Sequence, residues 1–284
     1  MINIAIAGST GFLGTRLTEA LLKRNYNVIN IMRAINSNNH QNSHSNSQLI
    51  LYEDLYDNYL SKIDILINLV CCYGKKSESL SEMVDANINV PIKLYEFCMK
   101  NDITYINLGT ILSSEVSMYA LTKKHFQDIL KMHQSPTKAI NLVIDQFYGK
   151  NSSETNFITY FLNRLKYNKK NIKLSSGFQR REFIYIDDVI SAFLFLIGNI
   201  KNIPSNINEI AINTKQPVAL KDFLTEIENK FKIIDPNCCT KLLFGALEMR
   251  PGESDSNFDE YVSLIEFGWK PQDSISSGIS KFLK

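Results

Sequence analysis

Three glycines spaced three residues apart follow a short apolar run at the start of the chain. The run is Ile2–Ala7, and the glycines are Gly8, Gly11 and Gly14. Leucines then repeat at helical spacing, which predicts a helix over Thr15–Arg24. Glycines between a strand and a helix let the backbone turn tightly and approach a pyrophosphate, which the first helical N–H groups can bind. This order predicts a dinucleotide-binding turn rather than an ordinary structural turn.

Apolar runs alternate with helical patterns along the first half of the chain. The predicted strands are Ile2–Ala7, Asn27–Met32, Leu49–Tyr52, Ile63–Val70, Ile103–Leu108 and Ala139–Ile144. Helices are predicted over Ser81–Met99, where Pro91 should cause a kink or begin a new helix, and over Tyr119–Met132. The alternation predicts an α/β fold of Rossmann type, a doubly wound parallel sheet covered on both faces.

The pattern loosens after about residue 150. Three further helices are predicted there, over Asn156–Tyr167, Asp187–Gly198 and Leu220–Phe231. We therefore expect residues 1–150 to bind NADP and residues 151–284 to form mainly a small substrate-binding lobe, with segments that return to the main sheet.

Composition and charge exclude several classes of protein. The chain has 284 residues, 44% of them hydrophobic, and a net charge of +2, which gives no broad electrostatic case for nucleic acid or membrane binding. No signal peptide and no apolar stretch long enough for a membrane span is evident. The adjacent pairs Cys71-Cys72 and Cys238-Cys239 suit reduced thiols in a cytoplasmic protein better than disulfides or a metal knuckle. The polar segment Asn36–Gln48 is predicted as a surface loop, and its His40 and His44 are too isolated to predict a metal site.

Arg33 bears on the choice of cofactor. It ends the second predicted strand, and no acidic residue follows until Glu53. An acid at this position would accept a hydrogen bond from a free ribose 2′-hydroxyl, whereas a guanidinium suits a 2′-phosphate. We therefore expect NADP(H), with NAD(H) as the alternative.

Tyr119 and Lys123 form a Tyr-x-x-x-Lys motif on a predicted helix, so they share one face. A nearby ammonium should lower the pKa of the phenol, which could then give a proton to a carbonyl oxygen as hydride arrives at carbon. The lysine can also hold the nicotinamide ribose. After the fifth strand of a dinucleotide fold, this pair indicates a catalytic site rather than a surface pair.

These motifs together resemble those of the extended short-chain dehydrogenase/reductase family, which acts on nucleotide sugars, over nearly the whole chain. The matching segments are Gly8–Gly14, Asp64–Leu69, Asn87 with Glu96, Tyr119–Lys123, Arg181–Val189, Arg250–Glu253 and Phe267–Pro271. The resemblance implies cofactor contacts from Gly8, Thr10, Gly11, Phe12, Leu13, Gly14, Arg33, Asn68, Leu69, Asn87 and Lys123. It also implies that Arg181 and Arg250 bind the nucleotide diphosphate, as guanidinium groups can.

Within the family the chain resembles the abequose/paratose synthase type, which reduces 4-keto sugars carried on CDP. The similarity lies in Tyr73–Lys76, Thr122–Phe126, Leu220–Leu224 and Phe244–Glu248. Thr110 matches the family's carbonyl-binding hydroxyl, but it precedes Tyr119 by only nine residues, so Ser113, Ser114 or Ser117 could take its place. Dehydratases carry Thr-Asp-Glu there, whereas this chain has Thr110-Ile111-Leu112, which argues against dehydration. The arginine that the family usually has in strand six is absent from this chain, and Val143 falls near its position.

The resemblance implies an NADPH-dependent 4-keto-reductase with catalytic residues Thr110, Tyr119 and Lys123. Its substrate would be a nucleoside-diphosphate 4-keto-6-deoxy or 3,6-dideoxy hexose for surface polysaccharide such as O-antigen. CDP is the expected carrier and dTDP the second choice. An epimerase with bound NAD and a non-catalytic NADP-binding regulator are the alternatives. Relatives often form homodimers through the helix that bears Tyr-x-x-x-Lys.

Overall fold

The structure, a computed structural model, describes residues 2–32, 47–51, 63–133, 135–167 and 170–284. Some residues named above lie outside these ranges: Arg33, His40, His44, Tyr52, Glu53 and all but the last two residues of the segment Asn36–Gln48. Among the described residues no helix is long and apolar enough to span a membrane.

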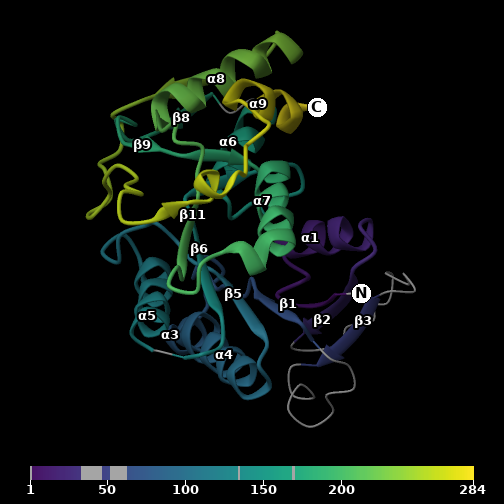
Figure 1. The fold of residues 1–284 in the computed structure, drawn as a ribbon. Coiled ribbons are helices and arrows are strands. Elements are labelled where there is room, and N and C mark those ends of the chain that lie inside the picture. The colour runs from purple at the N-terminus through teal and green to yellow at the C-terminus, as the bar shows by residue number, and fades with distance from the viewer. Residues whose placement is uncertain (1, 33–46, 52–62, 134, 168–169) are drawn as a thin grey trace.

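A parallel sheet of eight strands, counted over the described residues, forms the centre of the molecule (Figure 1). Its order is β14-β11-β6-β5-β4-β1-β2-β3, so the first six strands follow the 3-2-1-4-5-6 order of a dinucleotide-binding fold. The strands are β1 (Asn3–Ala7), β2 (Asn27–Met32), β3 (Ser47–Leu51), β4 (Ile65–Asn68), β5 (Thr104–Leu108), β6 (Ala139–Ile144), β11 (Glu209–Ile212) and β14 (Val262–Ser263). The Rossmann-type fold predicted from the sequence is confirmed.

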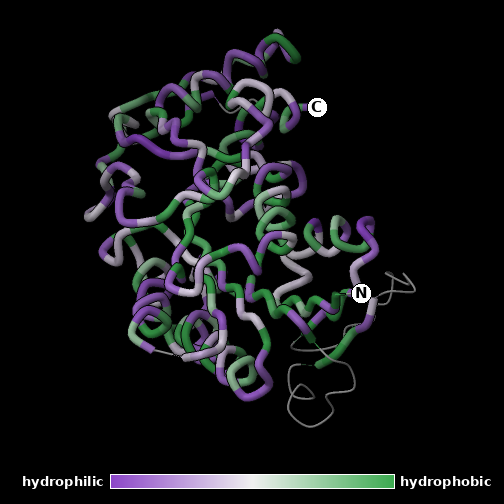
Figure 2. The backbone as a smooth tube through the Cα atoms, viewed as in Figure 1, coloured by the Kyte–Doolittle hydropathy of each residue, from purple (hydrophilic) through white to green (hydrophobic). Residues whose placement is uncertain are grey.

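Alternating side chains place two hydrophobic cores on the two faces of this sheet. In β1, Ile4 and Ile6 pack on one face, whereas Ala5 and Ala7 pack on the other. The first face is covered by α1 (Phe12–Leu22) and α7 (Ile186–Asn199), and the second by α4 (Val90–Asn101) and α5 (Met118–Met132). Figure 2 shows hydrophobic residues along the central strands, as expected for a sheet buried on both faces.

The helix predicted across Pro91 is divided in the structure. It consists of α3 (Leu80–Val84), a π-helical turn (Asp85–Asn89) and α4, in which Pro91 lies in the first turn. Proline is tolerated in the first turn because the N–H that it lacks has no partner within the helix there. The three stretches follow one another without a break, and Val84, Asp85 and Asn89 at the junctions all have right-handed helical angles. The π-turn therefore marks a change in hydrogen bonding within the helix just before Pro91.

The second half of the chain forms a smaller lobe beside the sheet (Figure 1). Its helices are α6 (Phe157–Lys166), α8 (Leu220–Ile234) and α9 (Ile275–Leu283). Its strand pairs are β7 (Gln146–Tyr148) with β10 (Phe183–Tyr185), β8 (Asn171–Lys173) with β13 (Lys241–Leu243), and β9 (Arg180–Arg181) with β12 (Val218–Ala219). Strands β11 and β14, which follow residue 150, return to the edge of the main sheet.

A row of buried amides crosses the sheet on the face covered by α4 and α5. Asn68 donates to Asn107 at 2.9 Å, Asn107 donates to Asn141 at 2.7 Å, and Asn141 donates to Glu209 at 3.5 Å. These residues are paired directly across β4, β5, β6 and β11. At the β4 end, the Asn68 oxygen accepts from the backbone N–H of Val70 at 3.1 Å. The side chains of the row therefore serve as hydrogen-bond partners for one another.

Candidate active site

The turn between β1 and α1 has space only for glycine at two positions. Gly8 has a φ of +84°, and a Cβ there would lie 2.9 Å from the backbone carbonyl carbon of Leu69. A Cβ on Gly14 would lie 2.2 Å from the carbonyl oxygen of Gly8. Gly11 is the N-cap of α1, and no side chain among the described residues caps this helix. The bare turn and the uncapped helix start fit a dinucleotide pyrophosphate.

The other predicted residues of this turn differ in what they can offer a ligand. Thr10 and Gly11 are exposed. Phe12 is half-buried and stacks on Phe147 with ring centroids 6.2 Å apart. Leu13 is 5% exposed and belongs to the core, so only its backbone could face a cofactor.

Asn87 organises the segment that follows β4. It lies in the π-helical turn, accepts a hydrogen bond from the backbone N–H of Cys72 at 2.8 Å and donates to the Cys72 carbonyl at 2.9 Å. It also donates to Thr122 of α5 at 2.9 Å. The side chain is fully buried, and its hydrogen bonds join the segment after β4 to the helix of Tyr119 and Lys123.

Tyr119 and Lys123 lie one turn apart on α5, close to Thr110 at the end of β5. Thr110 is 4% exposed, and hydrogen bonding between its hydroxyl and Tyr119 acts to lower the pKa of Tyr119. The serines proposed as substitutes have other partners. Ser117 caps α5 by accepting from Ala120 at 3.2 Å, and Ser113 accepts from Glu115 at 3.4 Å. The geometry therefore favours Thr110 over these two as the hydroxyl beside Tyr119.

Burial dominates the electrostatics of this group. It raises the pKa of Tyr119 well above its ordinary value and outweighs the opposing hydrogen bonds from Thr110 and Tyr73. The expected lowering of this pKa by Lys123 is therefore not what the structure shows. Burial likewise lowers the pKa of Lys123, against the opposing effect of Cys71. The ammonium of Lys123 donates no hydrogen bond and forms no ion pair among the described residues, although only 3% of the residue is exposed. Such an ammonium suits the hydroxyl groups of a bound ribose.

Arg181 and Arg250 lie in different environments. Arg181 is 7% exposed, and its guanidinium lies 3.4 Å from Glu253 and donates to Ser256 at 3.4 Å. Arg250 is exposed. The pKa of Lys75 is lowered mainly by burial and secondly by the positive charge of Arg250. Arg181 thus supports the segment that carries Arg250, whereas the side chain of Arg250 lies at the surface.

A buried carboxylate adjoins this support. Asp145 follows β6, accepts from the backbone N–H of Glu182 at 2.9 Å and accepts a further hydrogen bond from the Ser256 hydroxyl. Its second oxygen has no hydrogen-bond partner among the described residues. Burial raises the pKa of Asp145 to about 6, against the opposing effects of Ser256 and Arg181.

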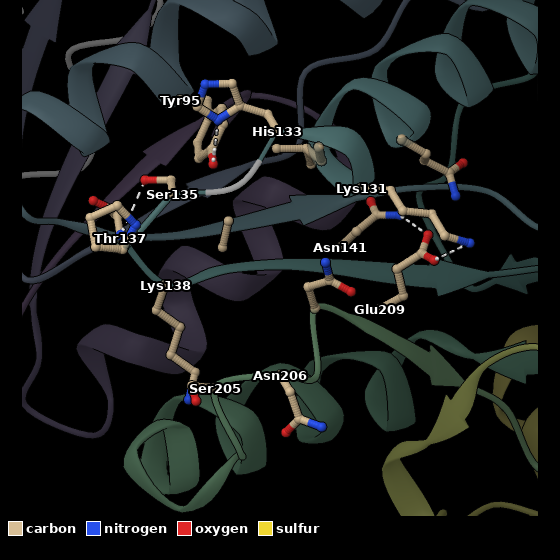
Figure 3. A pocket seen from close by; sticks show the side chains of 15 residues that line it. Tyr95, Lys131, His133, Ser135, Thr137, Lys138, Asn141, Ser205, Asn206 and Glu209 are labelled. Carbon is tan, nitrogen blue, oxygen red and sulfur yellow. Dashed lines mark hydrogen bonds and ion pairs between the residues drawn. The ribbon is translucent and has the colours of Figure 1, made fainter.

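A separate pocket of about 360 Å³ opens between α5, the start of β6 and the start of β11 (Figure 3). Lys131 and Glu209 form an ion pair of 3.6 Å across it, and Tyr95 lies 3.4 Å from His133. None of the predicted site residues lines this pocket. The described residues include no group of three or more His, Cys, Asp or Glu side chains that could hold a metal ion.

Two residues next to Tyr119 were not singled out by the sequence analysis as site residues. The rings of Tyr73 and Tyr119 have centroids 4.6 Å apart, and the thiol of Cys71 interacts with both Lys123 and Tyr73. Tyr73 begins the segment Tyr73–Lys76, which carries part of the resemblance, and both residues follow β4, which ends beside the glycine turn. No spacing rule links either residue to α5.

Comparisons with known proteins concern the family and the fold. The sequence profile of the NAD dependent epimerase/dehydratase family matches residues 4–211. The chain is similar to a CDP-abequose synthase of Salmonella typhimurium, with 31% identity over 99% of this chain and 97% of that protein. A dTDP-glucose 4,6-dehydratase of Bacillus anthracis, solved in complex with NAD, has a TM-score of 0.77 at 17% identity over 100% of this chain and 96% of that one. A UDP-glucose 4-epimerase of Thermotoga maritima, solved with UDP-glucose, has a TM-score of 0.77 at 18% identity over 99% and 97% of the two chains. Both of these solved structures have the same fold as this chain.

Proposed function

We propose that this chain, which belongs to the NAD dependent epimerase/dehydratase family, is an NADPH-dependent reductase of nucleotide-linked 4-keto sugars. The substrate would be a nucleoside-diphosphate 4-keto-6-deoxy or 3,6-dideoxy hexose, and the product a deoxy sugar for surface polysaccharide such as O-antigen. Residues 1–150 are assigned to the cofactor and residues 151–284 mainly to the nucleotide sugar.

The observation that carries this proposal is the group formed by Thr110, Tyr119 and Lys123. Burial keeps Tyr119 protonated by raising its pKa, and a protonated phenol beside Thr110 can donate to a carbonyl oxygen held between the two hydroxyls. Lys123 lies on the same face of α5, where its ammonium can bind ribose hydroxyls. The nicotinamide cofactor, when bound, supplies the hydride. The proton from Tyr119 then completes the conversion of the ketone to a hydroxyl group.

Similarity to the CDP-abequose synthase supports CDP as the carrier, with dTDP as the second choice. The choice of NADP(H) over NAD(H) depends on Arg33, which directly follows β2 in the sequence. The cytoplasmic location and a homodimer through α5 stay predictions from the sequence.

The test is an incubation of pure protein with NADPH and a panel of CDP- and dTDP-linked 4-keto-6-deoxy hexoses. Absorbance of the nicotinamide and mass of the product are followed together. We expect stoichiometric NADPH oxidation and a product heavier by two hydrogens. Isomerised sugar without net cofactor oxidation would instead indicate an epimerase. Tight NADP(H) binding without turnover of any sugar in the panel would indicate a regulator.

A further inference from the structure

Tyr73 presents a partly open aromatic ring next to the proposed proton donor. Its ring centroid lies 4.6 Å from that of Tyr119, with the ring planes tilted by 32°. The Lys75 ammonium lies 6.0 Å from the Tyr73 centroid. Even so, 44% of Tyr73 remains exposed, an unusually large fraction for an aromatic residue beside a buried catalytic group.

The backbone on both sides of Tyr73 is held in place. Asn87 binds both the N–H and the carbonyl of Cys72, as described above. Gly74 has a φ of +65°, and a Cβ there would lie 2.7 Å from the sulfur of Met83. Because Asn87 also donates to Thr122 of α5, the position of Tyr73 is tied to the helix that carries Tyr119. The ring is therefore a preformed surface rather than a loose side chain.

Lys75 lies near the Tyr73 ring, and Arg250 lies close enough to Lys75 to act on its charge. Lys75 donates to the carbonyl of Thr155 at 2.8 Å. The pKa of Lys75 is lowered mainly by burial and secondly by the charge of Arg250. Cations from the two lobes that lie close enough to repel each other favour an anion between them, and a diphosphate has the charge to join them. Three neighbouring pairs therefore connect Arg250 to Tyr119: Arg250 with Lys75, Lys75 with Tyr73, and Tyr73 with Tyr119.

A sugar whose diphosphate contacts Lys75 and Arg250 and whose C4 carbonyl meets Tyr119 must extend over Tyr73. Aromatic faces bind the C–H groups of sugars better than their hydroxyls, because a hydroxyl facing a ring loses water without gaining a partner. A 6-deoxy hexose has a methyl group where the parent sugar has a hydroxymethyl group. It therefore offers more apolar surface to an aromatic ring.

We propose that Tyr73 is a specificity-determining residue whose exposed ring packs against the sugar and selects deoxy hexoses over their hydroxylated counterparts. This inference rests on the proposed function, because it places a nucleotide sugar in the site. It assigns the selection to the aromatic ring and not to the Tyr73 hydroxyl.

The test compares binding of CDP, CDP-glucose and CDP-6-deoxyglucose to the full chain by titration calorimetry, with and without NADPH. The two sugars differ only by the hydroxyl at C6. We expect the wild-type protein to prefer the 6-deoxy sugar, and Tyr73→Ala to weaken binding of that sugar roughly tenfold while leaving CDP unchanged. Tyr73→Phe should keep the preference, because it retains the ring. Tyr160→Ala serves as the matched control, since Tyr160 is 46% exposed and has Arg164 over its ring at 5.5 Å.

The inference is overturned if the wild-type protein shows no preference, if Tyr73→Ala retains it, or if Tyr73→Phe loses it as fully as Tyr73→Ala. These ligands need no turnover, so the result is separate from that of the reductase assay. A protein that selects the 6-deoxy sugar but reduces no 4-keto sugar would retain the role of Tyr73 and refute the proposed reaction.

Discussion

The guanidinium of Arg181 lies 3.4 Å from the carboxylate of Glu253, and this ion pair joins two segments that the sequence resemblance assigns to the nucleotide sugar. Gln179 donates to the same carboxylate at 3.1 Å. Glu253 follows Arg250 by three residues, so the pair fixes the segment on which the exposed arginine is carried. Arg181 and Arg250, to which the resemblance gives the same role, therefore have different surroundings.

Replacing these arginines should separate the two effects. Arg250→Ala should weaken nucleotide-sugar binding by roughly 1.5–3 kcal/mol, the cost of losing a charge-assisted contact, without changing the free energy of unfolding. Arg181→Ala should also weaken binding and should in addition lower the free energy of unfolding by about 3 kcal/mol, because Glu253 loses its cation. Calorimetry and urea unfolding measure the two quantities. A loss of NADPH binding in either variant would place the arginines at the cofactor.

Tyr119→Phe tests the proton donor. The variant keeps the ring and its contact with Tyr73, so folding and NADPH binding should be preserved. Loss of the positioned acid should reduce kcat by at least about 10²-fold. Steady-state kinetics with the 4-keto sugar measures this effect. A turnover close to that of the wild type would mean that another group protonates the sugar oxygen.

Arg33→Ala tests the choice of cofactor. It should raise the KM for NADPH and leave the KM for NADH nearly unchanged, because only the 2′-phosphate loses its partner. Kinetics with the two cofactors at a fixed sugar concentration provides the comparison. Equal effects on both would show that the arginine does not read the 2′ position.

Gly14→Ala tests the glycine turn. Its Cβ would lie 2.2 Å from the Gly8 carbonyl oxygen and 2.7 Å from the Ser9 Cα, so the turn must shift and NADPH binding should be lost or strongly weakened. Gly198→Ala in α7 is the control, because no atom lies within 4 Å of the added Cβ. That variant should be as stable as the wild type or up to about 1 kcal/mol more stable. Fluorescence titration with NADPH and thermal unfolding report both effects, and normal NADPH binding by Gly14→Ala would contradict the assignment of the turn.

Asp145 should make stability depend on pH. Its pKa is raised from 3.8 to about 6, first because of burial, so the folded protein binds a proton more tightly than the unfolded chain. The corresponding stability is fully present below about pH 4 and is lost as the pH rises through 6, a difference of about 3 kcal/mol. Asp145→Asn carries no such charge, so its stability relative to the wild type should increase between pH 5 and pH 8. Urea unfolding at several pH values measures this difference, and a constant difference would show that Asp145 does not titrate in this range.

Regular strands and long helices were the part of the fold that local sequence patterns could predict. Asn27–Met32 and Ala139–Ile144 are predicted with the bounds that the structure has, because each is a buried apolar run between polar segments. The predicted loop Asn36–Gln48 extended too far, since β3 begins at Ser47 and its polar first residues pair with β2. Strand β9, of two residues, is too short to have a period and is formed only because β12 lies beside it.

The candidate site could be predicted where a short segment carries a complete motif. The glycine turn and the Tyr119–Lys123 pair are of this kind. The resemblance identified Asn87 by its spacing from Glu96, but its contact with Thr122 depends on how the π-helical turn packs against α5. The contact between Tyr73 and Tyr119 likewise depends on packing that no local pattern encodes. Arg181 has the expected motif but an unexpected partner, because burial near Glu253 is a property of the folded lobe.

The amide row across β4, β5, β6 and β11 has a consequence for how these strands align. Each asparagine donates to the next, so the row has one direction and requires every member at the same level of the sheet. A one-residue slip of β5 would bring Ile106 or Leu108 beside Asn68 and leave buried amides without partners, at a cost of about 1–3 kcal/mol each. Apolar neighbours alone would tolerate such a slip far better. The row thus selects a single strand register, and with it the level at which Thr110 emerges from the sheet next to α5.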